Sequence, residues 1–397
     1  MTSRTERRIR ALFFESGRAG GSVFRLKSVL ERLDRDRFEG GFLTWYGDQA
    51  ATCLFEVPSL FCRRSLGLKR DRPDTFKHLR GFPLPTPFAL YYYFACRRIF
   101  ARHKPDVAYM NTGIGFHEPA ILAASRAGVP VACHLRSSAP LDPDERRAAP
   151  RVTRFVTSSR WGAQQFASEL GRPAHEVDCV YEGIDLAAFE ARAQAELAPA
   201  LPSGPVYACL VGSLIERKRP LLAIQGLAAA RARCPDLRLV LAGDGPLRSE
   251  VERLVVETRL EGSVIRLGRV PAVPSLLRQC HVGLLVSTSE GMPNAVMEYM
   301  AAGLPVVTSP VPGVDELVEH GRTGMVLPDP PTPETIAEAL LALASSPERR
   351  AAFGACGRKK IEGREFSVET EALGVGEVLG KLAGLGPEGG RRPAGLS

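Results

Sequence analysis

Residues 282–308 have the sequence VGLLVSTSEGMPNAVMEYMAAGLPVVT, and this stretch decides the fold of the second half of the chain. The apolar run 282–286 predicts a buried strand, and 305–308 predicts the next one. Between them a loop leads into a predicted helix that ends near Gly303. Continuous apolar strands joined by helices indicate a parallel sheet that helices cover on both faces.

Two acids of this stretch, Glu290 and Glu298, are the strongest candidates for a binding site. Glu290 lies in the predicted loop, and Glu298 lies in the first turns of the predicted helix. Eight helical residues span about 12 Å, which is the scale of a nucleotide sugar. The backbone N–H groups near Gly291 to Ala295 would point at an anion, because a helix start leaves donors without intrahelical partners. Two hydroxyl-binding acids around a phosphate-binding helix start suggest a sugar-nucleotide site.

The rest of the chain shows the same alternation of apolar strands and helices. In the second half we expect strands over 206–211, 237–242 and 264–267, and helices through 232 and over 247–259. In the first half we expect strands over 9–14, 106–110, 129–135 and 155–158, and a helix over 23–33 that follows a glycine-rich loop. The fold class is therefore α/β, with two Rossmann-like, doubly wound parallel-sheet domains that face each other across a ligand-binding cleft. The expected boundaries are an N-terminal domain over 1–186, a linker over 187–204, a C-terminal domain over 205–365, a helix over 366–385 that returns to the N-terminal domain, and a disordered tail over 386–397.

The composition is that of an ordinary soluble protein, with 45% apolar and 24% charged residues among 397. A net charge of +8 is compatible with nucleic acid, an anionic membrane face or an anionic small substrate. No zinc-ligand spacing or RNA-binding signature is present, so no nucleic-acid partner is expected. Nine cysteines without a Cys-x-x-Cys pair, a first apolar run too short for a signal peptide, and no membrane-length apolar stretch predict a cytoplasmic protein with reduced thiols.

Two further loops follow predicted strands and carry candidate phosphate-binding residues. Gly243-Asp-Gly245-Pro-Leu-Arg248 allows close backbone approach and places a charge near a helix start. As a dinucleotide fingerprint it fails, since Arg248 stands where a third glycine is expected, and an ordinary turn explains it equally well. Glu216-Arg-Lys218-Arg219 follows the strand at 206–211, and ligands bind at the carboxyl ends of strands in open α/β sheets. Beside Arg248 and Glu290, these cations favour a diphosphate clamp over a solvated cluster.

Three other features carry weaker signals. His134 ends an apolar strand and faces the expected cleft, and His117 is its rival as the functional histidine. Asp142-Pro-Asp144 has the spacing of a metal-binding pair, but a surface loop explains it better, and no metal site is expected. Residues 61–80 mix basic residues with Phe and Leu, and a solvated face is slightly favoured over a patch for anionic lipid headgroups.

Taken together, these motifs resemble the GT-B retaining glycosyltransferases known as glycosyltransferase family 4, of the group 1 type. The match is dense over 205–345 and sparse between 35 and 105, and the shared order of the motifs makes it specific. The segments that carry it are the E-x7-E segment 289–298 with its following strand, 312–316, 321–324, the glycine-proline loop 243–248, Glu182-Gly-Ile-Asp185 with Phe189, and Gly20-Gly21.

The resemblance implies a GT-B architecture and a role for each matched residue. Glu298 would bind the ribose hydroxyls, Glu290 the donor sugar, and Lys218 the diphosphate. His134 would contact the transferred sugar, so that His134, Glu290 and Lys218 form the expected catalytic set. The other residues expected to bind the donor are Gly20, Gly21, Arg217, Gly243, Gly245, Arg248, Gly291, Met292, Pro293 and Asn294.

The implied reaction moves a hexose-type sugar, with retention, from a UDP- or GDP-sugar to a glycan or lipid-linked acceptor. It would serve polysaccharide, lipopolysaccharide or glycolipid biosynthesis, with no metal and no cofactor besides the nucleotide sugar. A departing diphosphate develops negative charge, which Lys218 and a helix start would stabilise without a metal. The enzyme would be cytoplasmic, with the anionic face of the inner membrane as a further partner.

Two departures from the family pattern bear on the donor site. Ser213 stands where Arg is usual, with Arg217 or Arg219 as a substitute, and Glu182 stands where Asn is common. Two alternatives stay open: a sugar-nucleotide 2-epimerase on the same plan, and a non-catalytic sugar-nucleotide-binding scaffold. A nicotinamide dehydrogenase is disfavoured because the third glycine is missing.

Overall fold

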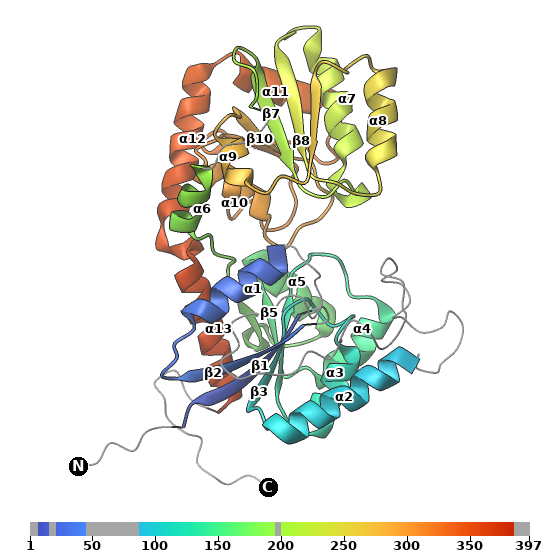
Figure 1. Cartoon of the computed structure of the whole chain (residues 1–397), viewed down its shortest axis with the longest axis vertical. Coiled ribbons are helices and arrows are strands. Elements are labelled where there is room, and N and C mark those ends of the chain that lie inside the picture. Colours follow the sequence, from blue (N-terminus) through green and yellow to red (C-terminus); the bar gives the residue numbers. More distant parts are fainter. Residues whose placement is uncertain (1–6, 16–20, 45–86, 195–199, 385–397) are drawn as a thin grey trace, which may run out of the picture. The chain divides into compact units, whose positions relative to one another are not determined.

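The computed structural model describes residues 7–15, 21–44, 87–194 and 200–384, and the chain forms two compact units (Figure 1). Unit 1 comprises Met1–Tyr181 and Val368–Ser397, and unit 2 comprises Glu182–Ser367. Both units are layered α/β structures, so the predicted fold class is confirmed.

Unit 1 has, among its described residues, a six-stranded parallel sheet with the strand order β2-β1-β3-β4-β5-β6. Its strands are β1 (Ile9–Glu15), β2 (Phe38–Thr44), β3 (Val107–Met110), β4 (Val131–Leu135), β5 (Arg154–Thr157) and β6 (Val177–Cys179). Its helices are α1 (Gly21–Arg32), α2 (Pro87–His103), α3 (Glu118–Arg126), α4 (Pro143–Ala148), α5 (Arg160–Leu170) and α13 (Val368–Leu382).

Strand β1 shows why this sheet is covered on both faces. Successive side chains of a strand point to opposite faces. Phe13 accordingly packs in the cluster that contains α1 and α13, whereas Phe14 packs in the cluster of α2, α3 and α5. Because both faces are buried, β1 is apolar throughout most of its length, which made it recognisable from the sequence.

Unit 2 has the strand order β12-β11-β10-β7-β8-β9 in a second six-stranded parallel sheet within the described residues. Its strands are β7 (Val206–Val211), β8 (Leu237–Ala242), β9 (Val264–Gly268), β10 (Val282–Leu285), β11 (Val306–Thr308) and β12 (Gly324–Val326). Its helices are α6 (Leu186–Ala193), α7 (Pro220–Arg231), α8 (Arg248–Glu257), α9 (Val273–Leu277), α10 (Asn294–Ala301), α11 (Pro333–Ala344) and α12 (Pro347–Glu362). Helices α7, α8 and α11 share one apolar core with the sheet.

The sheet of unit 2 reverses its winding between β7 and β10. From β7 the chain proceeds to β8 and β9 on one side, and from β10 to β11 and β12 on the other. At such a reversal the loops after the two neighbouring strands diverge and leave a crevice at their carboxyl ends. Figure 1 shows β7, β8 and β10 side by side in this sheet.

The predicted strands all form, within two residues of their expected bounds, and three short or polar strands were missed. β2 contains Glu39, Gly40 and Gly41, so it lacks the apolar run of a buried strand. β6 and β12 have three residues each, too few for a periodicity to show.

Helix α6 occupies the first residues of the linker predicted over 187–204. Asp185 caps this helix by accepting from the Ala188 N–H at 2.9 Å, and Phe189 is buried. Alanine-rich sequence with a good N-cap favours a helix over an extended connection. The compact units divide before Glu182, and α13 belongs to unit 1. The predicted disordered tail, 386–397, lies outside the described residues.

Candidate functional site

The loops after β7 and β10 bring two predicted cations onto one predicted acid. Lys218 Nζ donates to Glu290 Oε1 at 2.6 Å, and Arg217 Nη1 lies 2.9 Å from Glu290 Oε2. The two strands are hydrogen-bonded neighbours at the winding reversal, so this cluster lies where an open α/β sheet binds ligands.

Glu290 is ionised in this setting. Burial of its side chain raises the pKa of the carboxyl group, but Lys218 and Arg217 outweigh burial and hold that pKa below its ordinary value. The side chain of Glu290 is only 9% exposed, whereas that of Arg217 is 40% exposed. The cluster therefore presents one buried carboxylate with a largely buried cation, Lys218 (14% exposed), and a cation that reaches toward solvent, Arg217.

Backbone hydrogen bonds hold the two loops together. Thr288 N donates to Arg217 O at 2.8 Å, and Arg217 Nη1 donates to Ser289 O at 2.5 Å. Arg217 thus bridges both loops with its backbone and its side chain. Of the two residues predicted as substitutes for the cation missing at Ser213, Arg217 contacts Glu290, and Arg219 takes the left-handed backbone conformation before α7 (φ 47°).

Gly243 and Gly245 serve a contact between loops. A Cβ atom on Gly243 would lie 1.8 Å from Gly212 O, and one on Gly245 would lie 2.4 Å from Leu214 O. The 212–214 backbone therefore runs against both glycines, joined by Gly212 N to Ala242 O at 3.0 Å and Leu214 N to Asp244 O at 3.2 Å. The close approach that the sequence predicted is made by the protein's own backbone.

Helix α10 presents one polar face. Asn294 and Glu298 are the half-exposed residues of this helix, and their spacing of four places them on one side. Pro293 is the N-cap of this helix and supplies no side-chain hydrogen bond to it. Gly291, Met292 and Pro293, which the sequence predicts to bind the donor, lie in the bend that leads into this helix.

Tyr299 fixes α10 to the sheet, and sequence reasoning missed it. Its hydroxyl accepts from Val211 N at 2.8 Å and donates to Leu284 O at 3.3 Å, so it joins β7 to β10. Gly283 makes room for the ring, since a Cβ atom there would lie 2.2 Å from Tyr299 Cγ. The adjacency of Tyr299 to Glu298 was the available signal.

Arg248 forms its ion pair with a residue outside the expected diphosphate clamp. It begins α8 with an exposed side chain, and its Nε lies 3.2 Å from Glu252 Oε1, one turn further along the helix. Such an exposed pair contributes little to stability.

His134 and His117 are both buried in unit 1. His134 Nδ1 lies 2.9 Å from the Tyr109 hydroxyl, and its Nε2 lies 3.1 Å from Ser158 Oγ. Burial and the positive charges of Arg136 and Arg25 hold the pKa of His134 well below 6.5. His117 is likewise enclosed, and burial lowers its pKa to about 3. Both rings are therefore neutral.

A buried polar network at the carboxyl edge of the unit 1 sheet was not predicted. Asn111 Nδ2 donates to Glu15 Oε2 at 2.5 Å, and Arg136 Nη2 donates to Asn111 Oδ1 at 2.8 Å. Glu371 of α13 lies 3.7 Å from Arg136 and 3.3 Å from Arg25 of α1. Glu15 ends an apolar strand, and that position was the only local signal of the network.

The remaining predicted features have plain outcomes. Gly20 and the 61–80 patch lie outside the described residues, and Gly21 begins α1. Asp142 caps α4 by accepting from Asp144 N and Glu145 N, so the Asp142–Asp144 spacing has a structural explanation. The described cysteines form no disulfide. Within the described ranges, every helix is too short or too polar to cross a bilayer.

Each of the two units is a doubly wound parallel α/β structure, and this is the fold of glycosyltransferases of GT-B architecture. The family model described as glycosyl transferases group 1 matches residues 194–360, and that described as Glycosyltransferase Family 4 matches residues 56–188. The chain belongs to glycosyltransferase family 4, group 1 type, as the sequence motifs predicted.

Curated relatives match over part of their length. D-inositol 3-phosphate glycosyltransferase of Pseudarthrobacter chlorophenolicus is 28% identical over 191 residues, covering 46% of this chain and 46% of the relative. A GDP-mannose-dependent alpha-(1-6)-phosphatidylinositol monomannoside mannosyltransferase of Mycolicibacterium smegmatis is 30% identical over 220 residues, covering 52% of this chain and 56% of the relative. The chain thus spans about half the length of these curated relatives.

Solved structures match over nearly the whole chain. HepE of Anabaena in complex with UDP has a TM-score of 0.70 at 20% identity, covering 94% of this chain and 100% of that one. Sucrose-phosphate synthase of Thermosynechococcus elongatus has a TM-score of 0.72 at 18% identity, covering 94% and 99%. At these identities the likeness shows the fold alone.

Proposed function

We propose that this protein transfers a hexose-type sugar from a nucleotide-diphosphate donor to a glycan or lipid-linked acceptor, with retention at the anomeric carbon and without a metal. The product would enter polysaccharide, lipopolysaccharide or glycolipid synthesis. The single observation that carries the proposal is the pair of contacts from Lys218 and Arg217 to the buried Glu290.

The donor would lie along the crevice between β7 and β10 of unit 2. Glu298, half-exposed on α10, would accept hydrogen bonds from the ribose hydroxyls, and Glu290 would accept from hydroxyls of the sugar. The diphosphate would lie between the amides at the start of α10 and the ammonium group of Lys218.

The cations give this site its chemistry. As the bond between the anomeric carbon and the phosphate oxygen breaks, negative charge grows on the diphosphate. Lys218 and Arg217 are fixed in place by Glu290 before the reaction, so they stabilise this charge without reorganising. The departing diphosphate stays on one face of the sugar, and held in this way it can take the proton of the acceptor hydroxyl. The acceptor oxygen would then bond to the anomeric carbon from that same face, which retains the configuration. No covalent nucleophile is assigned.

His134 takes a positioning role in this proposal. Its side chain is fully buried, and both ring nitrogens are engaged by Tyr109 and Ser158. It would hold the ends of β3, β4 and β5 in register at the carboxyl edge of unit 1, rather than touch the sugar as the family resemblance implied.

The proposed donor class draws support from named relatives. One relative is named as GDP-mannose-dependent, and solved neighbours are described in complex with UDP and with UDP-glucose. We therefore propose a UDP- or GDP-sugar.

The test of the donor site is the thermal stability of the wild type and of Glu298→Ala with UDP, GDP, ADP or dTDP. A nucleotide at a hundredfold excess over its Kd stabilises the folded state by about 2.7 kcal/mol. For a unit of this size that raises Tm by roughly 5–11 °C. One nucleotide should stabilise the wild type and the control Glu338→Ala, an exposed acid on α11, but not Glu298→Ala. No shift with any nucleotide would reject the site.

Product analysis separates this function from its alternatives. A 2-epimerase would convert the nucleotide sugar with no acceptor present. A scaffold would bind the nucleotide yet transfer nothing to any acceptor tried. Loss of transfer in Glu290→Ala, with nucleotide binding retained, is the outcome that the proposed roles predict.

A further inference from the structure

Helix α2 of unit 1 carries an exposed face with an apolar half and a basic half. Leu90, Tyr91 and Phe94 are 44%, 46% and 56% exposed, although large apolar side chains are usually covered. Arg97, Arg98 and Arg102 are exposed on the following turns. Residues separated by three or four positions share one side of a helix. The α2 face, defined as these six residues, is therefore one continuous surface about 18 Å long.

The described residues do not neutralise the basic half of the α2 face. Within the described part of the chain, Arg97, Arg98, Arg102 and the nearby Lys104 form no ion pair. Elsewhere the arginines are commonly paired, as Arg154 is with Asp178 and Arg172 with Glu176. This uncompensated charge lies beside exposed aromatic rings, which points to an anionic and apolar partner.

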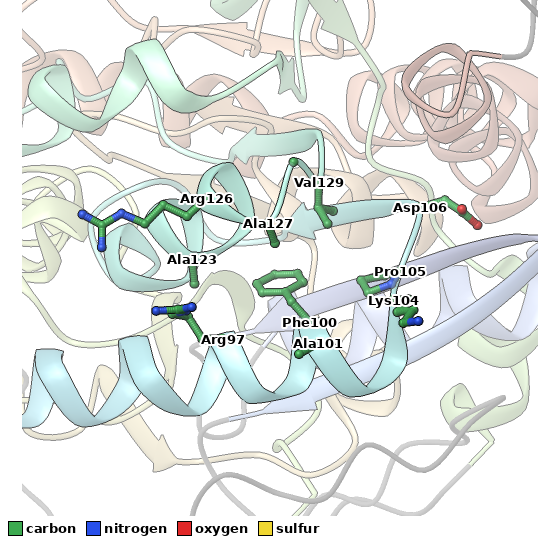
Figure 2. A pocket seen from close by; sticks show the side chains of 11 residues that line it. Arg97, Phe100, Ala101, Lys104, Pro105, Asp106, Ala123, Arg126, Ala127 and Val129 are labelled. Atoms are coloured by element: carbon green, nitrogen blue, oxygen red, sulfur yellow. The ribbon is translucent and has the colours of Figure 1, made fainter.

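A pocket of about 630 Å³ opens at the basic end of the α2 face, between α2 and α3. Figure 2 shows Arg97 on α2 and Lys104 just after its end, with the Phe100 ring between them, and Arg126 on the α3 side. Arg126 is fixed there because it donates to the Tyr93 hydroxyl at 2.6 Å. Asp106 also lines the pocket, but its carboxylate accepts from Arg10 N at 2.8 Å and from Arg7 at 3.1 Å. The pocket therefore offers cations to an anion.

We infer that the α2 face docks unit 1 on an anionic lipid bilayer, with Leu90, Tyr91 and Phe94 inserted at the interface and a lipid phosphate received in the pocket. An interfacial helix needs apolar and aromatic anchors beside basic residues, and the α2 face has both. Nucleic acid would use the cations but leave Leu90 without a partner. The inference does not depend on sugar transfer in unit 2.

Flotation of the full chain with liposomes tests the inference. Vesicles of phosphatidylcholine with 30% phosphatidylglycerol should bind the wild type, vesicles of phosphatidylcholine alone should bind it far more weakly, and added salt should release it. Arg97→Gln with Arg98→Gln should lower the partition coefficient about 25-fold, at roughly fivefold for each charge. Phe94→Ser should lower it about tenfold.

Matched controls keep the test specific. Arg278→Gln with Arg349→Gln removes two exposed charges from unit 2, and Leu373→Ser removes an apolar side chain that is 67% exposed on α13. Both controls should bind anionic vesicles like the wild type, and every variant should keep the wild-type Tm. Equal binding of the α2 variants and the controls would overturn the inference, as would retention on RNA without vesicle binding. Nucleotide binding in unit 2 should be unchanged in all of them, so failure here leaves the proposed function separately testable.

Discussion

Gly243→Ala should destabilise unit 2 before any ligand is added, because the space at Gly243 is already filled. The new Cβ would lie 1.8 Å from Gly212 O, whereas ordinary contacts begin near 3.4 Å, so the 212–214 backbone must retreat by about 1.6 Å. That movement breaks the hydrogen bonds from Gly212 N and Leu214 N, at about 1 kcal/mol each. Overpacking adds about 1–3 kcal/mol, giving roughly 3–5 kcal/mol in all.

Scanning calorimetry without nucleotide measures this loss. For a unit of 186 residues (Glu182–Ser367), 3–5 kcal/mol corresponds to a fall in Tm of about 6–20 °C. Gly262→Ala is the matched control, since a Cβ there meets no atom within 4 Å, and it should keep Tm within about 2 °C. Nucleotide affinity should also fall, because the displaced loop leads to Lys218. Full stability with lost nucleotide affinity would refute the reasoning and show that Gly243 serves the ligand directly.

Three other expectations follow from the site and its surroundings. Glu290→Gln should lower the free energy of unfolding by about 1–3 kcal/mol at neutral pH. Because the pKa of Glu290 is lower in the folded state, this loss should be complete above about pH 4.5 and should shrink as the pH falls through the pKa of the folded state. A difference in Tm between the wild type and the variant that stays constant down to pH 3 would contradict this expectation. Tyr299→Phe removes the acceptor of Val211 N and should lower Tm by about 2–8 °C, with unchanged Tm as the contrary result. In NMR spectra the ring protons of His117 and His134 should show no titration between pH 5.5 and 8, and a midpoint within that range would mean that the rings are open to water.

The sequence predicted what periodicity and order along the chain encode. The apolar runs at 206–211 and 282–286 gave the strands of unit 2, and Lys218 and Glu290 were placed after them. Lys218 and Glu290 come into contact because the strands before them, β7 and β10, are neighbours at the winding reversal. The order of the motifs along the chain can suggest this topology.

What the sequence could not predict depends on contacts between distant residues. Arg25 and Glu371 are 346 positions apart, and no local pattern links them. Gly243 and Gly245 show the same limit. A glycine in a sequence indicates that another group can pack closely against it, but the sequence does not show whether that group is a ligand or the protein's own backbone. The enclosure of His134 by Tyr109 and Ser158 likewise depends on three strands and on a side-chain orientation that only the folded sheet defines.

The return of α13 to unit 1 has a consequence for synthesis on the ribosome. Unit 1 is interrupted by 186 residues of unit 2, and its core cluster includes Val368, Ala372, Val375 and Leu379. Translation at 5–20 residues per second separates the two halves of this core by roughly 10–40 s. Unit 2 is continuous and can therefore complete its fold first, although it is encoded second. During that interval the α13-facing side of β1 and α1 remains uncovered, and this is the period in which a chaperone would have most to protect.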